Sequence, residues 1–131
     1  MTCRRTVVLA LLLASCAPAT SPSGPPQQLL DRLHFGRNRA GIEVVTDSAW
    51  AAFLAEEVTP RFRDGFRVIT GLGQWLDSTS TVERERLFLL EVVHPATPAA
   101  DSAFAAIIAS YKDRFHQEAV LRVTRPVRVD F

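Results

Sequence analysis

Three side chains in this sequence could take part in chemistry if the fold placed them together: His34, Glu91 and Arg122. An imidazole can transfer a proton, a carboxylate can act as a base, and a guanidinium can hold an anion. Gathered on one semi-apolar surface, they could bind a polar or anionic ligand. They could equally form an ion-pair network that neutralises Glu91. We favour the network, because structural networks also gather such groups.

No motif in the chain fixes an activity. The sequence has no HExxH, CxxC, P-loop or GxSxG pattern, and the GLG stretch at 71–73 lacks the third glycine of a dinucleotide site. Two glycines in a strand fit a bulge or a close backbone approach better. The histidines His34, His94 and His116 have no metal-ligand spacing to one another. We therefore expect no metal and no cofactor, and we favour a non-enzymatic role while leaving catalysis open.

The hydrophobic pattern alternates between the periods of strands and helices. It predicts strands over 29–36, 66–76, 85–94 and 119–129, and helices over 47–58 and 98–115. Thr46 and Thr97 are the expected N-caps, with Pro98 at the first helical position. The order β-α-β-β-α-β is typical of a ferredoxin-like α+β fold. That fold has a four-stranded antiparallel sheet of order 4-1-3-2 with two helices on one face.

The third predicted strand is apolar on both faces. Leu87, Leu89 and Val93 make up its second face, interrupted by Glu91. A strand that is apolar on both sides should be covered on both sides, whereas two helices cover only one. We expect the open face to be buried by a second copy, as in dimeric α/β barrels, or by another envelope protein. Partial cover by the tether and loops is the alternative.

The same open face should carry the candidate polar groups. His34 with Arg32 comes from the first strand, Glu91 from the third, Arg122 from the fourth and Arg67 from the second. A deep pocket holding His34, Glu91 and Arg122 would favour an enzyme. A flat apolar face with Glu91 fully paired would favour an interaction surface.

The amino terminus has the layout of a secretory signal peptide. Arg4 and Arg5 precede a short apolar run over 7–14, too short to cross a bilayer. Leu13-Ala14-Ser15-Cys16 resembles the bacterial lipobox, which implies cleavage before Cys16 and its lipidation. Residues 1–15 would then be the signal peptide, 16–28 the lipidated cysteine with a disordered tether, and 29–131 one domain. An ordinary signal peptide that happens to contain Cys16 is the alternative.

The net charge and the predicted localisation limit the possible partners. Loss of residues 1–15 removes two arginines from 15 basic residues against 14 acidic ones, so the mature charge is about −1 with His neutral. A strongly basic face for nucleic acid is therefore not expected. Ala17 after the acylated cysteine lacks the aspartate associated with inner-membrane retention. We expect a bacterial envelope protein that faces the periplasm from the outer membrane.

Three segments resemble an uncharacterised bacterial family. They are "EEVTPRFRDGFRVITGLGQW" (56–75), "LLEVVHP" (89–95) and "YKDRFHQEAVLR" (111–122). The family is the domain of unknown function thirty-five seventy-four, and the resemblance covers roughly 33–131. Its members are often predicted lipoproteins, so the resemblance implies the fold and a lipid-anchored localisation but no reaction.

Together these features predict a lipid-anchored envelope protein whose domain self-associates or binds a partner through its open sheet face. A small-ligand-binding or enzymatic domain of the dimeric α/β-barrel type is the alternative.

Overall fold

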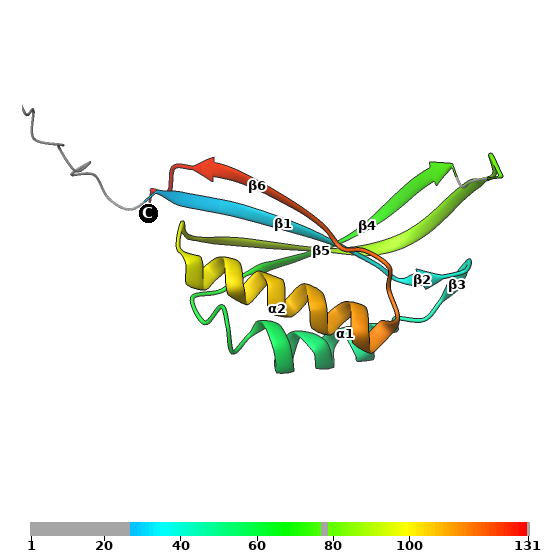
Figure 1. Cartoon of the computed structure of the whole chain (residues 1–131), viewed down its shortest axis with the longest axis horizontal. Helices are drawn as coiled ribbons and strands as arrows, with labels where there is room; N and C mark the ends of the chain where they lie inside the picture. The colour runs from blue at the N-terminus through cyan, green and yellow to red at the C-terminus, as the bar shows by residue number, and fades with distance from the viewer. Residues whose placement is uncertain (1–26, 77–78, 131) are drawn as a thin grey trace, which may run out of the picture.

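One antiparallel sheet with two helices packed on the same face makes up the fold (Figure 1). The computed structural model describes residues 27–76 and 79–130, so the predicted signal peptide and Cys16 lie outside the described residues. The elements are β1 (Gln28–Gly36), β2 (Asn38–Arg39), β3 (Ile42–Glu43), α1 (Asp47–Phe53), the π-helical turn η1 (Leu54–Val58), β4 (Arg67–Leu76), β5 (Val82–Pro95), α2 (Pro98–Phe115) and β6 (Leu121–Val127). The main sheet has the order β4-β5-β1-β6.

The α+β class, the four-stranded antiparallel sheet and its two helices confirm the prediction, but the described part of the chain forms six strands. The additional pair is the β2–β3 hairpin, in the stretch that we expected to be a plain connection. Its turn places Ala40 and Gly41 at φ 48° and 76°. At position 41, the absence of a side chain in glycine removes the steric penalty of this conformation. No described helix is long and apolar enough to cross a membrane.

Strand lengths also depart from the prediction. β5 starts at Val82 rather than Glu85, because its pairing with β4 continues out to Leu76 opposite Val82. The resulting β4–β5 arm extends past the helices (Figure 1). β6 is shorter than predicted and runs only over Leu121–Val127.

The helices form where the sequence predicts them. The side-chain oxygens of Thr46 and Thr97 accept the backbone N–H groups of Ala49 and Ala100, at 3.1 Å and 3.2 Å. Both predicted N-caps are thus confirmed, since such a bond satisfies one of the free donors at a helix start. Helix α2 spans the predicted residues 98–115, and His116 follows it as the C-cap in the left-handed conformation.

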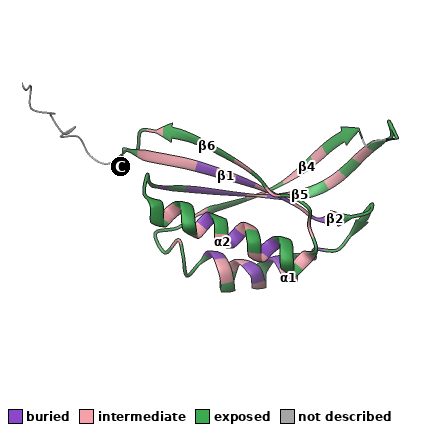
Figure 2. Ribbon diagram, in the orientation of Figure 1, coloured by how far each residue is buried: buried purple, intermediate pink, exposed green. Residues whose placement is uncertain are grey.

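An aromatic cluster holds the helices against the sheet. Trp50 of α1 stacks on Phe88 of β5, with ring centroids 4.6 Å apart and planes 4° from parallel. Tyr111 of α2 meets Phe35 of β1 edge-on at 4.6 Å. Figure 2 shows that the buried residues lie along the central strands β1 and β5 and on the helices. This burial provides the main stabilisation of the domain and leaves the opposite sheet face without a helix.

Candidate functional site

The sheet face opposite the helices is the candidate site, and we call it the open face. Strand register and the two-residue alternation of side chains define it. Its side chains include Gln28, Leu30, Arg32, His34, Arg67, Ile69, Trp75, Glu83, Glu85, Leu87, Leu89, Glu91, Val93, Leu121, Val123 and Arg125.

Leu87, Leu89 and Val93 lie on this face as predicted, within an extended strand. Leu87 and Leu89 are half-buried by their neighbours on the sheet, and Val93 is 45% exposed. On β6, Leu121 is 58% exposed and Val123 46%. The helices therefore leave apolar side chains uncovered on β5 and β6, the two strands that flank β1.

Gly71 and Gly73 of β4 support the side chain of Leu87. A Cβ atom added at either glycine would meet a Leu87 methyl carbon at 3.2 Å or 3.1 Å. The pairing of β4 with β5 is continuous through both glycines, so the predicted bulge is absent and the close approach is made by a side chain. The two glycines let Leu87 lie flat across the edge strand.

Glu91 is the polar centre of the open face. Its Oε1 accepts from Arg32, whose Nε lies at 2.7 Å, and its Oε2 accepts from Arg67, whose Nε lies at 2.9 Å. The second nitrogen of each guanidinium fork binds the same oxygen. Hydrogen bonds from Arg67 and Arg32 lower the pKa of Glu91, outweighing the opposite effect of burial. Glu91 is thus a fully paired carboxylate and not a free base.

His34 lies two residues along β1 from Arg32, opposite Leu89. Burial and the nearby positive charge of Arg32 both lower its pKa. The imidazole is therefore neutral near pH 7.

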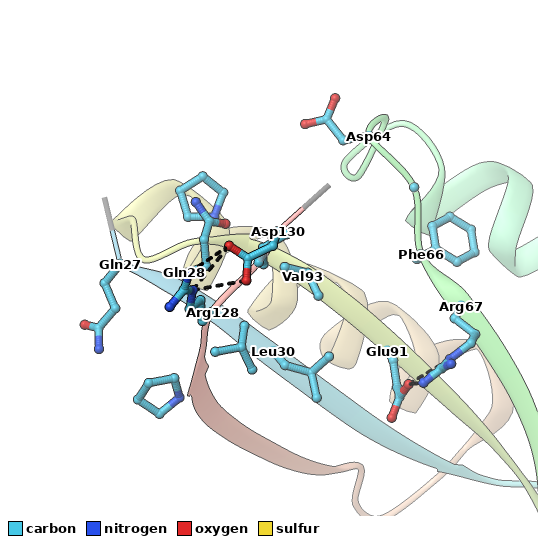
Figure 3. A pocket seen from close by; sticks show the side chains of 15 residues that line it. Gln27, Gln28, Leu30, Asp64, Phe66, Arg67, Glu91, Val93, Arg128 and Asp130 are labelled. Atoms are coloured by element: carbon cyan, nitrogen blue, oxygen red, sulfur yellow. Dashed lines mark hydrogen bonds and ion pairs between the residues drawn. The ribbon is translucent and has the colours of Figure 1, made fainter. Parts of the chain in front are cut away.

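A wide groove opens at one end of the open face (Figure 3). Its volume is about 1550 Å³, and apolar residues of β1, β5 and the C-terminal segment form much of its wall. Arg67 and Glu91 border it on one side, and Arg128 and Asp130 pair on the other. His34 and Arg122 do not line it.

Arg122 is not part of the open face, which corrects the prediction. It pairs in register with Leu33, whose side chain is buried beneath the helices. Its Nε and Nη2 bind the two carboxylate oxygens of Asp31 at 2.8 Å each, and its guanidinium lies 4.4 Å from the centre of the Phe104 ring. The buried Asp31 charge and this ring hold Arg122 on the helix side. Leu121 and Val123 consequently face outward, the reverse of the predicted phase.

Asp31 also binds His94, and this pair resembles a catalytic dyad only superficially. His94 Nε2 lies 2.6 Å from Asp31 Oδ2, while its Nδ1 lies 2.8 Å from the backbone oxygen of Pro95. With both ring nitrogens facing acceptors, the imidazole has no free atom with which to accept a substrate proton. The described residues contain no group of three His, Cys, Asp or Glu that could hold a metal.

Two buried polar residues escaped the sequence analysis. Asp31 alternates in phase with Leu33 and Phe35, so its inward position was available as a signal. Arg37, 1% exposed, binds the backbone oxygen of Val45 and the Glu43 carboxylate, and it lies over the Phe88 ring at 4.5 Å. No local pattern marks Arg37, because its partners belong to the hairpin and the core.

A family model matches residues 30–131 and carries the description "Protein of unknown function (DUF3574)". The chain belongs to this family. No curated protein matches this DUF3574 chain. Among solved structures it is similar to a phage SAM lyase in complex with S-methyl-5'-thioadenosine, at a TM-score of 0.63 and 12% identity, covering 82% of this chain and 86% of the lyase.

The apo state of a phage SAM lyase is also similar, at a TM-score of 0.59 and 13% identity, covering 76% of this chain and 81% of the lyase. At such identities the likeness concerns the fold.

Proposed function

We propose that this DUF3574 protein is a lipid-anchored interaction module of the bacterial cell envelope, which presents its open face to a protein partner. The observation that carries the proposal is the uncovered apolar face whose central carboxylate is already fully paired. Exposed apolar surface next to satisfied polar groups is typical of an interface.

The charge of the open face indicates the kind of partner. Near Val93 and Val123, Arg32, Arg67 and Arg125 stand against Glu91, and His34 is neutral, so this end of the open face carries an excess of positive charge. Glu83 and Glu85 lie farther along β5, on the arm. An acidic border around an apolar surface would complement this positively charged end. We therefore infer a partner whose apolar contact region is bordered by Asp or Glu.

The lipid anchor is the second part of the proposal. Lipidation of Cys16 would attach the domain through the residues before β1, of which residues 17–27 could reach roughly 36–40 Å when extended at about 3.3–3.6 Å per residue. Mass spectrometry of the mature amino terminus should show a diacylglyceryl-modified Cys16. The Cys16→Ser variant should lose membrane association. An unmodified terminus at another residue would refute the anchor.

We further infer that the domain is ferredoxin-like. Counted among themselves, the four long strands run β6-β1-β5-β4, or 4-1-3-2, which supports a ferredoxin-like domain carrying the β2–β3 hairpin as an insertion.

A photo-crosslinking residue placed on the open face tests the interaction. Positions 93 and 121 are exposed there, while position 105 on the outer side of α2 is a matched control. In living cells, crosslinks to one envelope protein should arise from 93 and 121 but not from 105. Leu121→Asp should abolish the adduct formed from 93 without changing the thermal midpoint. Equal adducts from all positions, or none, would refute the docking role.

A small-ligand site is the second candidate. The groove of about 1550 Å³ and the likeness in fold to a phage SAM lyase in complex with S-methyl-5'-thioadenosine favour it. Calorimetric titration of residues 17–131 with S-methyl-5'-thioadenosine tests it, because every buried core residue lies within 33–111. Saturable binding that Arg67→Met weakens would support the ligand site, and absence of heat would count against this ligand.

A further inference from the structure

We propose that β4 is a dimerisation edge, which pairs antiparallel with β4 of a second copy about a twofold axis centred on Leu72. The result is one continuous eight-stranded sheet. This inference concerns the sheet edge and does not rest on the proposed role of the open face.

The two edges of the sheet differ in how they resist pairing. Among the described residues β4 pairs only with β5, and β6 only with β1. β6 carries Arg122, Arg125 and Pro126, and the proline has no N–H to offer a neighbour. β4 reads RVITGLGQWL, with no charge after Arg67 and no proline. Natural edges are normally blocked by such residues, so β4 has the composition of a strand that is paired.

The side chains of β4 give the same indication. Its arm extends past both helices, and it exposes Leu72 to 84%, Leu76 to 66%, Trp75 to 46% and Val68 to 37% (Figure 1). A two-stranded ribbon with apolar residues in water is marginal by itself. A second strand alongside would cover these residues on both faces of the ribbon.

Symmetry restricts the possible pairings. A twofold axis relating adjacent antiparallel strands is perpendicular to the sheet, so both copies place their helices on the same side. One residue then faces its own counterpart, and the other pairs are arranged symmetrically around it. Only the choice of the central residue remains.

With Leu72 at the centre, the strand is complementary to itself. Leu72 faces Leu72, Val68 faces Leu76 of the second copy, and Ile69 faces Trp75. The remaining pairs are Thr70 with Gln74 and Gly71 with Gly73, so apolar meets apolar and polar meets polar.

Shifted registers lose this match. Centring on Gly71 places Val68 opposite Gln74, and centring on Gly73 places Leu72 opposite Gln74 and Thr70 opposite Leu76. The composition of β4 therefore selects both the partner, a second copy, and one register.

Cysteine crosslinking tests the register. Residues 17–131 contain no cysteine, so an introduced one reports without background. Leu72→Cys should form a disulfide between two copies, because directly opposed residues lie within disulfide range. Thr70→Cys is the matched control: the two copies of position 70 would be four residues apart along the strands, about 13 Å at about 3.3 Å per residue, and should not crosslink.

Light scattering tests the dimer itself. The chain without substitutions should have twice the mass of a single copy. Leu72→Lys should return it to the monomer. Its circular dichroism spectrum should not change, since Leu72 is exposed in the single copy. Leu121→Asp should leave the dimer intact. A monomeric parent chain would overturn the inference, as would equal crosslinking at 70 and 72. A dimer that only Leu121→Asp dissociates would place self-association on the open face instead.

Discussion

Two carboxylates lie on neighbouring central strands and face opposite sides of the same sheet. Asp31 of β1 is fully buried beneath the helices, and its partners Arg122 and His94 have side chains only 23% and 6% exposed. Glu91 of β5 is equally buried, but its partners Arg32 and Arg67 are 40% and 70% exposed. The carboxylates are alike, whereas the cations that bind them differ in their access to water.

This difference separates a structural ion cluster from an available one. Burial by itself raises the pKa of Asp31, but hydrogen bonds from Arg122, Thr124 and His94 outweigh it and leave the pKa lowered. Every group of that cluster is committed to the core. On the open face, the guanidinium groups around Glu91 keep further N–H donors at the surface, where a partner can reach them.

Removing the buried charge should have the largest effect. Asp31→Asn leaves Arg122 and His94 facing a neutral amide in the core, and should lower the free energy of unfolding by about 3–5 kcal/mol. Urea denaturation measures it. Asp101→Asn is the control, because that carboxylate is exposed and also binds Arg122; its effect should be small. Equal losses in the free energy of unfolding would show that Arg122 stabilises the protein through its exposed pair with Asp101 as much as through its buried pair with Asp31.

Neutralising the second carboxylate, Glu91, should lower the free energy of unfolding by less than Asp31→Asn does. In Glu91→Gln, Arg32 and Arg67 can turn to water, so we expect a loss of about 1–2 kcal/mol in urea denaturation. A loss as large as that of Asp31→Asn would end the distinction between the two clusters.

Both carboxylates should make the protein sensitive to acid. Their folded-state pKa values lie below those of the unfolded chain, about 4. Their stabilisation is therefore fully present above about pH 4–5 and is lost as the pH falls through the folded values. Unfolding followed between neutral and acid pH should show a shallower decline in Glu91→Gln than in the parent. An unchanged acid limb would show that Glu91 is not stabilised as its contacts indicate.

The smallest effect is expected at the exposed cation. Arg67→Met removes one of the two forks on Glu91 while Arg32 keeps the other, so the loss should stay below about 1 kcal/mol. Arg122→Met should cost clearly more in the same urea assay, because it leaves Asp31 unpaired in the core. Similar values for the two variants would contradict the comparison.

Local sequence patterns were sufficient to predict the features that depend on a single helix or strand. The apolar stripe and its cap predicted α2 over its full length, and the two-sided apolar character of β5 placed Leu87, Leu89, Glu91 and Val93 on one face. Strand order and alternation also placed Arg32 and Arg67 on the face of Glu91, but the ion pairs between them were visible only in the structure. These features depend on the periods of helix and strand, which are properties of the chain.

The phase of β6 and the partners of Asp31 needed the tertiary structure. An edge strand has exposed positions on both faces, so alternation in Leu121–Val127 does not say which residues point inward. The buried charge of Asp31, brought opposite Thr124 by strand pairing, decided it and drew Arg122 under the helices. The sequence by itself determined the elements and the apolar open face, because those follow from periodicity. Only the folded chain decided which charges meet, because ion pairs form between residues distant in sequence.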